Sequence, residues 1–337
     1  MRKAIPMNHD SLSVEQTLAL LEEPREVVLC GHLNPDGDAL GSILALAALL
    51  ETMGHTVTKL LPKGDKAPGL YDFFDGYEGG YKFTAAGAYG KTPDLFIVVD
   101  APNKDRLGEA VEVFDRAGDT LVIDHHPDYT GFANHYLGDV GAPATGLLVW
   151  KLIRACKATI TPVMAMGCYV SLMTDTGHFA FQNTTADAFI AAGEMVAAGV
   201  SPSLANTLVY DTRSIGSLEL DSRLISRLAF AGGGKVVYSW VTLADFEELG
   251  ISRDETEGLP TILRSVKGVE IAILLREEKS KIRVNLRAKG DYDVGAFAHR
   301  FGGGGHKAAA GFTTYGTLKE AEAMILEEAD TYFSEIL

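Results

Sequence analysis

Short apolar runs rich in β-branched residues alternate with longer segments of helical character over the first two-thirds of the chain. Runs of this length are typical of buried strands, and the segments between them have the length and composition of helices. The predicted strands are residues 26–31, 55–61, 94–100 and 120–124, with helices at 39–53 and 107–117. Strands that alternate with helices predict an α/β fold, a mostly parallel sheet with helices on both faces.

The same pattern predicts a second, smaller α/β domain. Helices are expected at residues 144–155, 162–173 and 185–198, and Thr184 or Thr185 suits the N-cap position of the last. A helix over 214–230 then leads to the glycine run Gly232–Gly234. Beyond it, strands are expected at 235–242, 269–276 and 281–287, with helices at 244–249 and 294–300. The resulting division is a first domain at 1–213, a linker helix at 214–231 and a second domain at 232–337.

Composition places the chain among ordinary globular proteins. Its 337 residues are 47% hydrophobic and 22% charged. No apolar run is long enough to span a bilayer, and no apolar segment follows the basic start, so neither a membrane protein nor a secretory signal is expected. The three cysteines lack CxxC spacing, which argues against disulfides or structural zinc and favours a reducing, cytoplasmic location.

Net charge limits the class of partner. The chain carries a formal charge of −15 and has a pI near 5.0. Proteins that bind long nucleic acids usually present a basic face, because phosphate contacts supply most of their affinity. We therefore expect no long nucleic acid as partner, and any nucleic-acid substrate should be short.

Metal-ligand residue types follow three of the predicted strands. His32, Asp36 and Asp38 lie in the segment GHLNPDGDALGS after the first strand, Asp100 ends the run LFIVVD, and Asp124 ends LVID just before two histidines. Because the carboxyl ends of parallel strands meet at one edge of a sheet, these residues should lie close together. An unpaired buried carboxylate is costly, so three such strand ends favour a shared site over coincidence.

The ligand types indicate the kind of metal. Imidazole and carboxylate without thiolate suit Mn²⁺ or a similar ion better than structural zinc. Asp175, which follows an apolar predicted helix, would oppose the helix dipole unless a positive ion lay nearby. The competing interpretation of Asp36 and Asp38 is that one of them caps the helix that begins beside them.

These segments resemble a known family. HLNPDGDALGS, VVD, DHH and TDTGHFAFQNTT resemble, in that order, the four sequence blocks of the DHH phosphoesterase superfamily. GGGGHKAAAGF, residues 302–312, resembles the glycine–histidine signature of the C-terminal domain associated with it. Within the superfamily, the chain is similar to bacterial nano-RNases that also dephosphorylate 3′-phosphoadenosine 5′-phosphate.

The resemblance implies a two-metal centre in the first domain. One ion would be held by His32, Asp36 and Asp100. The ligands of the second would be Asp38, Asp100, His125 and Asp175. Asp100 would bridge two Mn²⁺ ions, with Mg²⁺ or Co²⁺ as alternatives. His126 would face the substrate phosphate, and Asp124 would orient the histidine pair. Such a centre activates water for phosphate-ester hydrolysis.

The second domain is expected to bind the substrate, in an active-site cleft between the two domains. Gly303, Gly304 and Gly305 would expose backbone N–H groups to a phosphate or base, although a plain glycine-rich turn explains them too. His306 would begin a segment where a helix N-terminus favours an anion. Arg287 is the candidate phosphate clamp, with a solvated arginine as its alternative, and Arg106 is a weaker candidate.

The expected function is hydrolysis of short oligoribonucleotides to mononucleotides and of 3′-phosphoadenosine 5′-phosphate to AMP. Alternatives on the same centre are a linear or cyclic dinucleotide phosphodiesterase and a pyrophosphatase or polyphosphatase. A catalytically silent nucleotide-binding module is a further alternative, and the acidic charge disfavours a long-strand exonuclease. The sequence leaves the oligomeric state open, a homodimer included.

Overall fold

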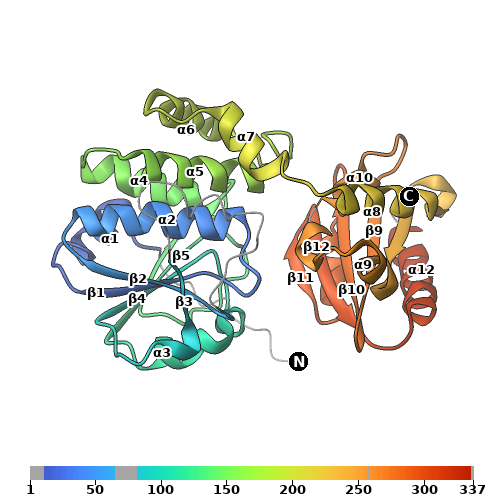
Figure 1. Ribbon diagram of the computed structural model, residues 1–337, viewed down its shortest axis with the longest axis horizontal. Helices are drawn as coiled ribbons and strands as arrows, with labels where there is room; N and C mark the ends of the chain where they lie inside the picture. Colours follow the sequence, from blue (N-terminus) through green and yellow to red (C-terminus); the bar gives the residue numbers. More distant parts are fainter. Residues whose placement is uncertain (1–10, 65–81, 257, 335–337) are drawn as a thin grey trace. The chain divides into compact units, whose positions relative to one another are not determined.

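The computed structural model describes residues 11–64, 82–256 and 258–334, which form two compact units. The chain passes from the first unit to the second between Thr212 and Arg213. Figure 1 shows one sheet with its own helices in each unit. Both units are α/β, in agreement with the fold class predicted from the sequence.

The first unit contains a six-stranded sheet in the order β3-β2-β1-β4-β5-β6, and every neighbouring pair is parallel. Its strands are β1 (Glu26–Cys30), β2 (Thr56–Leu61), β3 (Thr84–Ala85), β4 (Leu95–Val99), β5 (Asp119–Asp124) and β6 (His135–Gly138). The chain order reverses between β1 and β4. In open α/β sheets, the crevice beyond the carboxyl ends of strands at such a reversal is the usual place for a ligand.

Helices cover both faces of this sheet, as predicted. One face packs against α1 (Val14–Leu20), α2 (Gly37–Thr52), α4 (Thr145–Cys156) and α5 (Pro162–Asp175). The other packs against the short segments η3 (Lys104–Ala110) and α3 (Val111–Asp115). Helix α6 (Ala186–Ala197), capped by Thr185, and helix α7 (Pro202–Tyr210) lie beyond α4 and α5 (Figure 1).

The predicted helix at 107–117 is wrong in its first half. Gly108 has φ +51°, which interrupts the helical turns and leaves only Val111–Asp115 as α-helix. A Cβ at residue 108 would lie 2.7 Å from Leu33 Cδ2 and 3.1 Å from the Pro62 carbonyl oxygen. The glycine therefore lets this segment pass close to the loop after β1.

Helices α2 and α5 cross at a glycine pair. A Cβ on Gly41 would lie 2.3 Å from the Gly167 carbonyl oxygen, and one on Gly167 would lie 2.6 Å from that of Gly41. The backbones therefore approach more closely than larger residues would allow. This contact brings the first turn of α2, which carries Asp38, against the last turns of α5, which carry Ser171 and Asp175.

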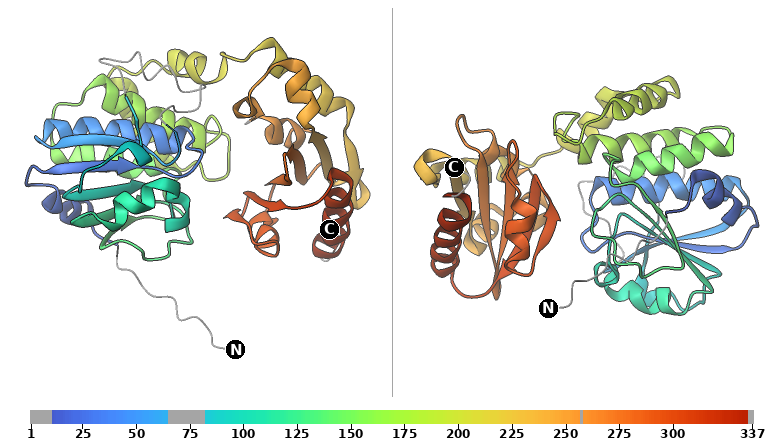
Figure 2. Two further views of the ribbon diagram at one scale, coloured as in Figure 1. Left: turned by 60° about the horizontal axis from the view of Figure 1, so that its bottom comes forward. Right: turned by 180° about the vertical axis from the view of Figure 1, so that it is seen from behind.

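The second unit contains a mixed sheet in the order β11-β12-β10-β9-β8-β7, in which only the pair β8 and β9 is parallel. Its strands are β7 (Ala229–Ala231), β8 (Val236–Val241), β9 (Ile271–Glu278), β10 (Lys281–Ala288), β11 (Gly304–His306) and β12 (Ala309–Thr314). Its helices are α8 (Ile215–Ser226), α9 (Leu243–Leu249), α10 (Leu259–Arg264), α11 (Val294–His299) and α12 (Leu318–Ser334). Helices α8, α9 and α10 cover one face, while α11 and α12 cover the other, where Figure 2 shows α12 in red beside the sheet.

Two predictions fail in this unit. The helix expected over 214–230 ends at Ser226, because Ala229–Ala231 pairs with β8 as an edge strand. Within this helix, Leu220 and Leu224 are buried in the core of the second unit. His306 precedes no helix either, since residues 304–306 and 309–314 form a β-hairpin. In that hairpin every second residue of β12 faces the core, a period that belongs to a strand.

The elements that were not predicted from the sequence include α1, β3, β6, α7, α10 and α12. Among the described helices, none by itself is long and apolar enough to cross a membrane. Only α6 and α7 together reach that length and composition, and they are bent by 105° at their junction.

Candidate metal centre

Six potential metal ligands converge beyond the carboxyl ends of β1, β4 and β5. They are His32, Asp36, Asp38, Asp100, His125 and Asp175. The first three lie on the β1–α2 segment, Asp100 follows β4, His125 follows β5, and Asp175 is the last residue of α5. The centre therefore lies at the carboxyl end of the sheet, where the strand order reverses.

The first ligand group contains His32, Asp36 and Asp100. One ligand atom from each lies within 4.8 Å of the others. His32 Nε2 is 3.8 Å from Asp36 Oδ2 and 3.5 Å from Asp100 Oδ2. The other ring nitrogen, Nδ1, lies 2.8 Å from the Leu33 carbonyl oxygen, which orients the ring with Nε2 toward the carboxylates.

The second group contains Asp38, His125 and Asp175, also within 4.8 Å of one another. His125 Nε2 is 3.6 Å from Asp38 Oδ2 and 3.8 Å from Asp175 Oδ2. Its Nδ1 lies 3.0 Å from the carbonyl oxygen of Ala142, so a backbone acceptor fixes this ring as well.

Asp100 lies close to both groups, through different oxygens. Oδ2 faces His32 at 3.5 Å, whereas Oδ1 lies 3.7 Å from His125 Nε2. The residue has φ +59°, a left-handed conformation that costs most residue types free energy and that aspartate and asparagine tolerate best. This conformation turns the carboxylate away from the course of β4 and presents one oxygen to each group.

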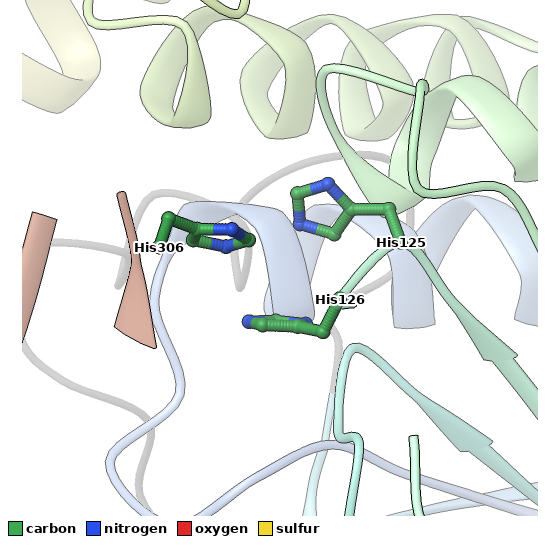
Figure 3. A group of neighbouring side chains, drawn as sticks. All are labelled: His125, His126 and His306. Atoms are coloured by element: carbon green, nitrogen blue, oxygen red, sulfur yellow. The ribbon is translucent and has the colours of Figure 1, made fainter. Parts of the chain in front are cut away.

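His126 lies beside the second group without being one of its members. Figure 3 shows the His125 and His126 imidazoles projecting from the loop after β5, with ring centroids 4.9 Å apart. His126 Nδ1 is 2.7 Å from Asp124 Oδ1. In this structure Asp124 contacts His126, whereas the Ala142 carbonyl oxygen contacts His125.

The donor set fits divalent cations. It consists of imidazole nitrogens and carboxylate oxygens, the ligands that Mn²⁺ and similar ions accept. Among the described residues, Asp124 Oδ2 is a buried oxygen without a hydrogen-bond partner, so this carboxylate can accept a further donor or cation.

Electrostatics within the centre balance the carboxylates with protonated imidazoles. Burial lowers the pKa of His32, but Asp100 and Asp36 outweigh it and bring that pKa to about 10. In the same way Asp38 and Asp175 overcome burial and raise the pKa of His125 to about 9. Bound cations require neutral imidazoles, so metal binding would release these protons.

Several contacts to the ligands involve residues that the sequence analysis missed. The Asn183 side-chain amide donates to the Asp175 carbonyl oxygen at 3.1 Å and lies 3.4 Å from Asp175 Oδ2. Thr145 and Ser171 donate to ligand carboxylates. Asn183 stands inside the block TDTGHFAFQNTT and could have been noticed there. Nothing in the sequence separates Thr145 or Ser171 from other hydroxyl residues.

The predicted substrate-binding residues other than Arg106 lie in the second unit. Across neighbouring strands, His306 pairs with Ala309, which pairs with Arg287. The two polar residues therefore share one face of the sheet, separated by a methyl side chain. Asn285 and Arg283 continue this face along β10, opposite the core that contains Leu286. The structure thus gathers a basic, polar surface around the predicted anchor.

Close packing requires glycine at two positions of this segment, Gly303 and Gly305, whereas Gly304 has room for a Cβ. A Cβ on Gly303 would lie 2.3 Å from the Gly311 carbonyl oxygen, and one on Gly305 would lie 2.5 Å from that of Ala309.

Arg106, in the first unit, has an exposed side chain, and its carbonyl oxygen accepts a 2.7 Å hydrogen bond from the Leu33 N–H. That bond joins Arg106 to the β1–α2 segment through the backbone.

Comparisons with known proteins give a matching family for each of the two units. Residues 26–174 match the model of the DHH family, N-terminal domain, and residues 233–335 match that of the DHHA1 domain. The chain is 28% identical to the bifunctional oligoribonuclease and PAP phosphatase NrnA of Thermus thermophilus, over 93% of this chain and 91% of that protein. It is 25% identical to the protein of the same name from Bacillus subtilis, over 92% and 95%.

Solved structures share the fold. An exopolyphosphatase-related protein from Bacteroides fragilis superposes with a TM-score of 0.86 at 24% identity and covers 98% of both chains. RecJ of Thermus thermophilus in complex with Mn²⁺ has a TM-score of 0.54 at 15% identity, over 98% of this chain and 55% of that one.

Proposed function

Because the chain is a DHH-family protein with a DHH N-terminal domain and a DHHA1 domain, we propose that it is a cytoplasmic two-metal phosphoesterase. Its substrates are short oligoribonucleotides, hydrolysed to mononucleotides, and 3′-phosphoadenosine 5′-phosphate, hydrolysed to AMP. The names of the relatives from Thermus thermophilus and Bacillus subtilis support these two activities. The observation that carries the proposal is Asp100, whose two oxygens face two separate groups of ligands.

The ligand assignment follows from those groups. His32, Asp36 and Asp100 would hold one ion, and Asp38, Asp100, His125 and Asp175 the other. We propose Mn²⁺ for both. Two divalent ions at such a centre lower the pKa of water and stabilise the attacking and leaving oxygens of an in-line displacement.

His126 is the proposed contact to the phosphoryl group. Asp124 holds its Nδ1, which directs the opposite nitrogen, Nε2, away from that carboxylate. An imidazolium in this position neutralises charge on phosphoryl oxygens or donates a proton to the leaving oxygen. The burial of Asp124 keeps its hydrogen bond to His126 away from competing water.

The polar face of the second unit is the proposed anchor for the rest of the substrate. The guanidinium of Arg287 suits a phosphate because it offers two parallel N–H donors. His306 and Asn285 lie on the same face, where the neighbouring Ala309 and Gly311 carry only small side chains. Such a surface supplies binding energy without taking part in bond cleavage.

Replacing Arg287 with alanine should raise KM by about 10-fold or more while kcat changes little, since the lost contact is equally strong in the ground and transition states. Steady-state kinetics on a dinucleotide measures both constants. Arg300→Ala is the matched control, because its guanidinium pairs with Glu328 of α12, which covers the opposite face of the sheet. An unchanged KM in the Arg287 variant would refute the anchor.

The proposed substrate class is tested by a panel of labelled 2- to 10-mers, a 24-mer, 3′-phosphoadenosine 5′-phosphate, cyclic dinucleotides and pyrophosphate with Mn²⁺. We expect kcat/KM to be highest for dimers to roughly pentamers and to fall for longer RNA, because a chain of net charge −15 repels added phosphates. Added salt should narrow the difference in kcat/KM between short and long RNA, because it screens this repulsion. Faster cleavage of the 24-mer at low salt would indicate a long-strand exonuclease, and exclusive cleavage of pyrophosphate would indicate a pyrophosphatase.

A further inference from the structure

Asp38 is held more firmly than the other carboxylates of the centre. It is 1% exposed, and its Oδ1 accepts hydrogen bonds from Ser171 Oγ at 2.5 Å, Ser42 Oγ at 3.1 Å and the Gly146 N–H at 3.1 Å. Its Oδ2 accepts from the Thr145 N–H at 2.8 Å. Three donors occupy the lone pairs of Oδ1, so Oδ2 is the oxygen that can still serve as a ligand.

Two of the four donors to Asp38, the Thr145 and Gly146 N–H groups, come from the start of helix α4. Ala144, at the N-cap position, has no side chain to accept the first N–H groups of this 12-residue helix. Asp38 belongs to α2, but its carboxylate accepts two of these N–H groups and therefore caps the start of α4. The partial positive charge at the helix start favours a carboxylate at this place, whereas burial and the neighbouring Asp100 raise the pKa of Asp38.

Thr145 connects two of the ligands. Its backbone N–H donates to Asp38 Oδ2, and its hydroxyl donates to Asp100 Oδ1 at 3.0 Å. These are the two oxygens that face His125, at 3.6 and 3.7 Å. Ser171, on α5, donates to the other oxygen of Asp38, Oδ1. The Gly146 N–H also donates to the Ser171 hydroxyl. Both hydroxyl residues are fully buried, so water cannot replace either one.

We propose that Thr145 and Ser171 are positioning residues that set the second group of ligands, Asp38, Asp100, His125 and Asp175, for its metal ion. The inference rests on the proposed function, since it presumes a metal ion at that group. Thr145 fixes the separation between Asp38 Oδ2 and Asp100 Oδ1, and Ser171 prevents the Asp38 carboxylate from rotating. Among the described residues, neither Thr145 nor Ser171 hydrogen-bonds to His32 or Asp36, so the first group, which is reached only through Asp100, should be affected less.

Thr145→Val tests the idea, because it removes the hydroxyl while it keeps the size of the side chain and the backbone N–H. Metal-free protein is titrated with Mn²⁺, and the room-temperature electron paramagnetic resonance signal of free Mn²⁺ gives the number of bound ions and their affinities. We expect one of two sites to weaken by about 10- to 100-fold, the usual effect of losing an outer-shell partner. Ser171→Ala should weaken the same site, and Thr145→Ser should restore wild-type binding.

Thr120→Val is the matched control. Thr120 is buried in the same sheet and its hydroxyl lies 2.5 Å from Asn134 Oδ1, at the end of β5 away from the ligands. This variant should bind both ions as wild type does. Circular dichroism of each metal-free variant separates a loss of affinity from a loss of fold, and if Thr145→Val does not fold, Ser171→Ala decides.

The outcomes distinguish this inference from the proposed function. Wild-type protein that binds two Mn²⁺ ions, with Thr145→Val and Ser171→Ala indistinguishable from it, would overturn the positioning role alone. Equal weakening of both sites would also overturn it, because the contacts predict a difference between the groups. Wild-type protein that binds no Mn²⁺ would instead remove the two-metal proposal on which the inference rests.

Discussion

Asp100→Asn is expected to lower kcat/KM by more than about 100-fold on every phosphate-ester substrate, a larger effect than the loss of an outer-shell partner. Each ligand group receives one oxygen from Asp100, so a single substitution weakens both groups together. Asparagine is the informative replacement because residue 100 has φ +59°, which asparagine tolerates and alanine does not. Activity with saturating Mn²⁺ and the number of bound ions provide the measurement.

A control for charge alone is available in the same unit. Asp105 is exposed on the segment after β4, and Asp105→Asn should retain both ions and full activity. If Asp100→Asn kept two ions at wild-type affinity and near-normal turnover, Asp100 would not bridge the two groups. The ligand assignment would then have to be rebuilt around a different residue.

The second large effect is expected for His126. His126→Ala should reduce kcat by about 10²- to 10⁴-fold, the range typical of a lost general acid. Asp124→Asn should cost less, about 10- to 100-fold, since it changes only the partner that orients the ring. Single-turnover rates with bound substrate measure the step directly and avoid effects on product release.

His135 provides a matched histidine–aspartate pair. Its Nε2 lies 3.0 Å from Asp119 Oδ2 at the opposite end of the same strands, so His135→Ala removes a similar contact without approaching the centre. We expect nearly unchanged kcat in that variant. Equal losses in the His126 and His135 variants would mean that stability, and not contact with the substrate, causes the effect.

Much of the first unit could be predicted from sequence because its strands are buried on both sides. Such strands appear as continuous apolar runs, and their carboxyl ends necessarily meet at one edge. This explains why residues as distant as His32, Asp100 and His125 could be assigned to one site. The short edge strand β6 carries no comparable run, and only its pairing with β5 makes it a strand.

The glycine-rich segment shows where sequence reasoning fails. Residues 302–312 contain small side chains with little intrinsic preference, and the structure makes them a hairpin because β12 finds its partner in β10. The sequence also could not predict which residues hydrogen-bond to the proposed ligand carboxylates. Which serine or threonine contacts Asp38 depends on how α2, α4 and α5 pack, and the Gly41–Gly167 contact sets that packing.

The capping role of two ligands affects how related sequences should be compared. Asp36 accepts the Asp38 and Ala39 N–H groups at the start of α2, and Asp38 does the same for α4. Replacing a cap typically costs about 1 kcal/mol of stability. Natural selection for folding alone would therefore favour aspartate or another capping residue at both positions in a descendant that had ceased to bind metal. His32 caps no helix, so its loss is the more informative sign that such a descendant has lost the metal centre.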